Sequence, residues 1–122
     1  MKLIKSVASL AILLVCTQVQ AGGTAENSKV LRIGTGPYFE SICGVTCVAV
    51  QVDPAPTGQA ACQYTTGNYW DYAIDTSTPA GQQMYSHILA AQMSDKPLNF
   101  VGTGSCISTN TYEKLNYSTT PR

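Results

Sequence analysis

Short runs of apolar and β-branched residues, separated by glycine and proline, predict a chain built mainly of β-strands. The clearest run, over residues 47–52, is rich in valine and ends at a stretch with two prolines and a glycine over residues 53–58. Those residues predict a turn, so residues 59–65 are expected to return as the hairpin partner. Looser alternation predicts four more strands, over residues 29–33, 69–74, 98–101 and 111–117.

One segment has the period of an amphipathic helix. Thr78 is suited to the N-cap and Pro79 to the first helical position, where no amide donor is needed. The helix is expected to end near Ser94, because Pro97 cannot continue it. Its apolar positions recur every three or four residues, at Ala80, Met84, Ile88 and Ala91.

Six short strands with one helix, placed between the fourth and fifth strands, predict a mainly β domain. This order fits a small β-barrel of the oligonucleotide/oligosaccharide-binding (OB) kind. A β-sandwich fits less well, because that architecture does not need the helix.

Residues 1–21 have the pattern of an export signal that is removed from the mature protein. Two lysines precede the apolar stretch 10–15, and small residues stand at the expected cleavage site after Ala21. The apolar stretch is shorter than the roughly 20 residues of a membrane-spanning helix. A lipid anchor on Cys16 is disfavoured, because Val15 stands where a small residue is expected. Residues 22–122 are therefore expected to form one secreted or periplasmic domain.

The charge of the mature chain argues against a nucleic-acid partner. Without Lys2 and Lys5 it has five basic and seven acidic residues, and no basic cluster stands out. Binding to nucleic acid depends on neutralising phosphates with such clusters.

The four mature cysteines predict two disulfides, for which three pairings are possible. Cys43 and Cys47 form the favoured short pair, since Gly44 lets the backbone turn back between them. The second pair is then Cys62 with Cys106. A metal site is disfavoured, because the cysteine spacing is not that of zinc motifs and the chain has a single histidine.

Little in the sequence points to catalysis, so no enzymatic activity and no cofactor are expected. His87 is alone on the polar side of the helix, and no free cysteine can pair with it. Asp71 and Asp75 could in principle act as paired carboxylates, but Asp75 is explained more simply as a residue at the entry to the helix. The two Gly-Thr-Gly segments, at 34–36 and 102–104, lack the full fingerprint of a phosphate-binding loop.

An aromatic segment provides the candidate binding residues. Along a strand, Trp70 and Tyr72 share one face, which is expected to pack against the helix. Tyr69 and Asp71 then face solvent, and with Tyr64 they form a candidate platform for a sugar. The alternative is that these are ordinary strand tyrosines.

Several short motifs stand out between about residues 60 and 117. They are Trp70, Asp75-Thr-Ser-Thr-Pro-Ala-Gly-Gln82, Met84-Tyr-Ser, Leu89-Ala-Ala and Val101-Gly-Thr-Gly-Ser-Cys106. On these motifs the chain resembles a group of small exported proteins of Gram-negative bacteria, most of which have no assigned function. In that group the cysteines matching Cys62 and Cys106 are usually the only two, which supports their pairing.

A second set of short motifs extends toward the start of the chain. It consists of Ser28-Lys-Val, Gly36-Pro-Tyr-Phe39, Ala61-Cys62 and Lys96-Pro97-Leu98. On these motifs the chain has a fainter resemblance to the pentameric, glycan-binding B subunits of the subtilase-cytotoxin and pertussis-toxin class. The resemblance implies a homo-oligomer, a glycan or glycoprotein receptor and a toxic A subunit as partners, and it places Ser28 at a sugar-contacting position. The chain departs from these subunits at residues 41–46 and after Phe100.

These observations together favour a non-enzymatic binding module of the toxin-B-subunit type that recognises glycans. A protein-binding role, as an inhibitor or as a subunit of an envelope complex, is the alternative. A small hydrolase comes third, because the nucleophile and base are missing.

Overall fold

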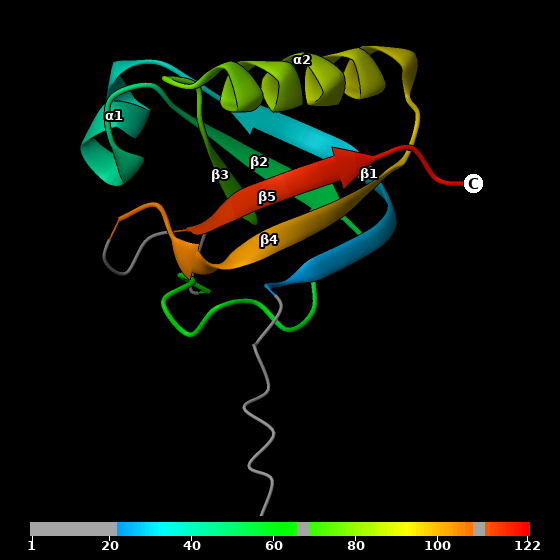
Figure 1. Ribbon diagram of the computed structural model, residues 1–122, viewed down its shortest axis with the longest axis horizontal. Coiled ribbons are helices and arrows are strands. Elements are labelled where there is room, and N and C mark those ends of the chain that lie inside the picture. Colours follow the sequence, from blue (N-terminus) through cyan, green and yellow to red (C-terminus); the bar gives the residue numbers. More distant parts are fainter. Residues whose placement is uncertain (1–21, 66–68, 109–111) are drawn as a thin grey trace, which may run out of the picture.

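A computed structural model of the protein describes residues 22–65, 69–108 and 112–122 (Figure 1). The predicted export signal lies outside these residues. The described part is mainly β, with five strands and two helices. In chain order they are β1 (Thr24–Gly34), α1 (Pro37–Cys43), β2 (Cys47–Asp53), β3 (Tyr72–Asp75), α2 (Pro79–Ser94), β4 (Leu98–Cys106) and β5 (Glu113–Thr119).

The strands pair in the order β1-β2-β3-β5-β4, and β4 returns to β1, so that the sheet closes into a barrel. All pairs are antiparallel except β3 with β5, which is parallel. Helix α2 lies across one end of the strands in Figure 1 and contacts β1, β3 and β5. Helix α1 packs beside β2 at the same end.

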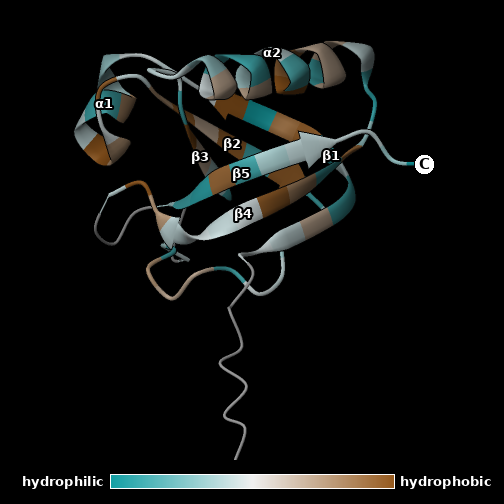
Figure 2. Cartoon of the chain, viewed as in Figure 1, coloured by the Kyte–Doolittle hydropathy of each residue, from teal (hydrophilic) through white to brown (hydrophobic). Residues whose placement is uncertain are grey.

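The core fills the barrel and the space below α2. Tyr72 and Phe100 stack at its centre with ring centroids 5.9 Å apart, and both are fully buried. Ile88 and Ala91 of α2 close the core from above, as the helical period predicted. Figure 2 shows the matching bands of hydrophobic residues along β2 and β4.

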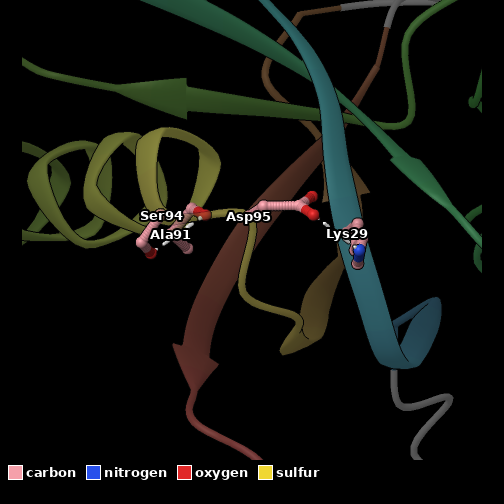
Figure 3. A network of polar contacts seen from close by, with 4 residues as sticks. All are labelled: Lys29, Ala91, Ser94 and Asp95. Atoms are coloured by element: carbon pink, nitrogen blue, oxygen red, sulfur yellow. Dashed lines mark hydrogen bonds and ion pairs between the residues drawn. The ribbon is translucent and has the colours of Figure 1, made fainter.

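Helix α2 has the predicted boundaries. The Thr78 hydroxyl accepts a hydrogen bond from the Gly81 amide at 3.1 Å, and Pro79 is the first helical residue. At the other end Asp95 is left-handed, with φ of 55°, and its carboxylate binds Lys29 Nζ at 2.9 Å (Figure 3). The Ser94 hydroxyl donates to carbonyls of the last turn, so both helix ends are hydrogen-bonded.

Residues 59–65 form no strand, which corrects the predicted hairpin. Side chains bind this segment to the barrel instead: Gln63 Nε2 donates to the Trp70 carbonyl, and Gln63 Oε1 accepts the Glu113 amide. Gln59 Nε2 donates to the Asp71 carbonyl. The barrel therefore has five strands rather than six, and α2 follows the third strand rather than the fourth.

Helix α1 has no counterpart in the sequence predictions, which place the only helix after Thr78. Pro37 occupies the first turn of the helix, and Gly36 and Gly44 bound it with φ of 102° each. A seven-residue helix between two glycines gives too few turns for a hydrophobic period to be recognised.

Both predicted disulfides are present. Cys43 is bonded to Cys47, with a Cα–Cα distance of 5.8 Å, and Cys62 to Cys106, with a distance of 6.1 Å. The first bridge closes the loop between α1 and β2, and the second joins the loop after β2 to the end of β4. None of the helices in the described ranges is both long and apolar enough to cross a membrane.

Candidate binding surface

An aromatic ladder stands on the outside of the barrel where α1 covers β1. The Phe39 ring lies directly on Gly34 of β1, at a place where any side chain would overlap it. The rings of Tyr38 and Trp70 meet Phe39 edge to face, with centroids 5.3 and 5.2 Å away. We call Tyr38, Phe39 and Trp70 the aromatic ladder.

Arg32 extends the ladder along β1. Its guanidinium carbon lies 4.2 Å from the centroid of the Trp70 ring, within the range of a cation–π contact. Nε donates to Gln51 Oε1 at 2.6 Å, and Nη2 donates to the Tyr69 carbonyl at 3.5 Å. These bonds hold the guanidinium over the indole ring.

A shift in strand register explains how Arg32 comes to the outer face. The pairing of β1 with β2 is irregular between Val30 and Arg32. Strict alternation would place these two residues on one face, but Val30 and Ile33 both pack against the core. The extra residue between them turns Arg32 outward, as a β-bulge does.

A second, smaller core supports the ladder from below. Cys43, Cys47, Ala73 and Tyr112 are buried together, and Phe39 and Trp70 pack against them. Burial raises the pKa of Tyr112, and neighbouring Tyr38 and Tyr64 raise it further. Tyr38 and Tyr64 themselves remain 71% and 49% exposed.

The structure separates the four residues predicted to bind a ligand. Tyr64 is exposed, and Tyr69 is half-buried beside Arg32. Asp71 and Ser28 are buried instead. Only the two tyrosines belong to the surface around the ladder.

The expected exposure of Asp71 is wrong. Its Oδ2 accepts the Val52 amide at 2.7 Å, so the carboxylate satisfies a donor at the end of β2. Burial raises its pKa, and the Val52 hydrogen bond and the charge of Arg32 oppose the rise. The Ser28 hydroxyl donates to the carbonyls of Glu26 and Pro54, so it is occupied inside the protein.

The expected packing of Trp70 under the helix is also wrong. The strand begins only at Tyr72, so Tyr72 and Ile74 are its inward residues, while Trp70 lies before the strand. There its ring meets Phe39 and Arg32 at the outer surface. The alternation of strand residues correctly predicts that Tyr72 faces inward. It does not apply to Trp70, because the strand begins only at Tyr72.

A polar groove of about 440 Å³ opens between α1 and the start of α2. Its walls carry hydroxyl and amide groups from Thr35, Thr46, Thr76 and Gln82, with the carboxylate of Glu40. Thr46 is left-handed, with φ of 71°, and its hydroxyl donates to Asp75 Oδ1 at 3.0 Å. Hydrogen bonds from Ser77 and Thr46 lower the pKa of Asp75, so that carboxylate is ionised at neutral pH.

His87 pairs with a serine rather than standing alone. Its Nδ1 lies 2.7 Å from Ser118 Oγ in a groove of about 320 Å³ between α2 and β5. Within the described ranges no carboxylate hydrogen-bonds the other ring nitrogen. In the same ranges, no cluster of three or more histidine, cysteine or acidic residues could hold a metal ion.

Comparison with protein-family models, with curated proteins and with solved structures finds no match to this chain.

Proposed function

We propose that this protein is a secreted or periplasmic, non-enzymatic binding module that recognises glycans. The observation that carries the proposal is the aromatic ladder, with exposed Tyr38 at its edge and the Arg32 guanidinium fixed at the other end. Sugars present weakly apolar C–H faces and hydroxyl groups. An exposed ring packs against the former, and the remaining guanidinium N–H groups can donate to the latter.

The position of the ladder supports the proposal. We infer that the barrel is of the OB kind, which binds oligosaccharides and oligonucleotides on the face of its second and third strands and on the loops that flank it. Here those loops contain α1, which carries Tyr38 and Phe39, and the segment before β5, which carries Tyr112. Two disulfides fit an oxidising compartment such as the periplasm or the medium.

A glycan array tests this function. Wild-type protein should bind a limited set of glycans, and Tyr38→Ala should weaken that binding about tenfold, the equivalent of about 1.4 kcal/mol. Tyr117→Ala is the matched control, because Tyr117 is 48% exposed on β5 and is not part of the ladder. Absence of binding across the array, or equal effects of the two substitutions, would count against a glycan site at the ladder.

A protein partner is the second candidate, and the loop between α1 and β2 favours it. Val45 at the tip is 75% exposed, and the Cys43–Cys47 bridge closes the loop around it. The Thr46 carbonyl accepts the amide and hydroxyl of Thr76, so the loop is fixed before any partner arrives. A rigid loop loses little entropy on binding. A photo-crosslinker at Val45 should then capture one defined protein, and a crosslinker at exposed Thr103 should not.

The proposal includes assembly of several copies, in the manner of the toxin B subunits, with a toxic A subunit as a further partner. The outward side of α2 carries Gln82, Gln83 and Ser86, which are polar but uncharged. Such a face can approach a copy of itself without repulsion between like charges.

A further inference from the structure

Glu113 places a carboxylate inside the base of the barrel. It is the first residue of β5 and is fully buried. Its Oε2 accepts the Gly23 amide at 2.7 Å, and its Oε1 accepts the Ala60 amide at 2.5 Å. The carboxylate also lies so close to Gly102 of β4 that a Cβ there would overlap it.

No cation balances this carboxylate within residues 22–65, 69–108 and 112–122. The one ion pair in those ranges joins Lys29 to Asp95, on the surface. Glu113 and Asp71 both act on the Tyr72 hydroxyl and raise its pKa, and neither of them supplies a positive charge. Removing a charged carboxylate from water costs free energy unless a cation accompanies it. A small positive group is therefore expected beside Glu113.

The backbone of Gly22 and Gly23 lies against the carboxylate. Both glycines are buried, and the Gly23 carbonyl accepts the Gly102 amide and the Tyr72 hydroxyl, each at 2.8 Å. Any side chain on Gly22 would overlap the backbone of β4. Gly23 N donates to Oε2, and neighbouring backbone nitrogens are at most about 3.7 Å apart, so the nitrogen of Gly22 lies within one residue of the carboxylate's partner.

We propose that Glu113 is the binding site for the α-ammonium group of Gly22, which forms when the export signal is removed. Hydrolysis of the Ala21–Gly22 peptide bond by an endopeptidase consumes one water. The leader leaves with a carboxylate on Ala21, and the released amine of Gly22 takes up a proton. Before cleavage the same nitrogen is an uncharged amide and cannot balance Glu113. The inference rests on the proposed export, but it is independent of glycan binding.

Removal of the export signal then stabilises the mature fold, because it creates the positive charge that balances Glu113. In a poorly hydrated site the ammonium and the carboxylate attract each other more strongly than in water. The pair raises the pKa of the α-amino group above its ordinary value of about 7.7–8.0. Its stabilisation is full below the pKa of the unfolded chain and is lost as the pH rises through the higher pKa of the folded chain.

The test uses protein exported from cells that express the full chain. Its mass identifies the first residue, which should be Gly22. The Cα chemical shift of Gly22 in ¹³C-glycine-labelled protein then follows the titration of its amino group without modifying it. We expect the pKa of the Gly22 α-amino group to lie at least one unit above the ordinary value, which corresponds to a tenfold higher affinity for the proton.

Two variants separate an ion pair from a general effect of burial. Glu113→Gln should return the α-amino pKa to its ordinary value or below, whereas Glu26→Gln, at an exposed residue of β1, should not change it. If Glu113→Gln does not fold, the wild-type titration decides. A first residue other than Gly22, or a wild-type pKa at or below the ordinary value, would overturn the proposal. Either result leaves the glycan array to judge the ladder separately.

Discussion

Among single residues, Asp71 links burial to the pH dependence of stability. Its pKa is raised, mainly by burial, so the native state holds this proton more tightly than the unfolded chain does. The resulting destabilisation is full above the folded pKa and disappears as the pH falls through it toward the pKa of an ordinary aspartate, 3.8.

Asp71→Asn should therefore flatten the dependence of stability on pH just above 3.8, because asparagine retains an acceptor for the Val52 amide and has no charge to bury. We expect equal or higher stability than the wild type at pH 7. Urea unfolding between pH 4 and 7 measures both properties, with exposed Asp53→Asn as the control. A variant that retains the wild-type slope would show that another group causes it.

The contact between Arg32 and Trp70 is the second prediction at the residue scale. Its geometry predicts a coupling energy of about 0.5–1 kcal/mol, the range for a cation–π contact at a partly exposed site. A double-mutant cycle of Arg32→Ala and Trp70→Ala, followed by urea unfolding, isolates this term from the packing lost in each single variant. Strictly additive effects would mean that the guanidinium is held by Gln51 and not by the ring.

At the scale of elements, the two disulfides should contribute unequally. The Cys62–Cys106 bridge spans a sequence separation of 44, and the Cys43–Cys47 bridge a separation of 4. In the chain-entropy account the longer loop stabilises the fold by about 4 kcal/mol and the shorter by about 2 kcal/mol. Paired Cys→Ala variants compared by urea unfolding test this order. A larger loss for the short bridge would point to packing of Cys43 and Cys47 in the second core as the dominant effect.

The elements that the sequence predicted well are those whose ends carry their own signals. Helix α2 has Thr78 and Pro79 at its start, and both perform the predicted roles. Strand β2 begins with four consecutive apolar residues, 47–50, and all four are buried. In these cases local chemistry and tertiary packing favour the same conformation.

The candidate site was less predictable, because its residues meet only through the fold. Tyr38 and Phe39 are on a helix too short to have a period, and their contact with Trp70 spans about thirty residues of chain. The alternation around residue 70 placed Asp71 in solvent, but a long-range hydrogen bond to Val52 buries it. Contacts between residues so far apart in the chain depend on the topology of the fold, and the composition and spacing of a short segment do not reveal it.

At the scale of the whole molecule, the two ends of the barrel have different roles. One end carries both helices and the polar groove, as the view in Figure 1 makes clear for the helices. The other end is closed by the segment around Gln59 and Gln63 and contains the buried carboxylate of Glu113. This second end is also joined to the proposed binding residues, because Gln63 donates to the carbonyl of Trp70 in the ladder.

Assembly is the prediction that belongs to this scale. The proposed sugar contacts at one ladder are weak singly, and assembly would strengthen binding because later contacts form at a high effective concentration. Light scattering should therefore give a mass that is a multiple of roughly 11 kDa, the mass expected for one mature domain of this length.

Met93, 81% exposed on α2, is the residue to substitute in order to disturb contacts between copies. Met93→Glu should lower the assembled mass and leave thermal unfolding of the subunit nearly unchanged, since exposed residues contribute little to stability. Thr103→Glu, at an exposed position on β4, is the matched control and should retain the wild-type mass. A strict monomer at high concentration would contradict assembly, and the ladder would then have to bind its glycan one site at a time.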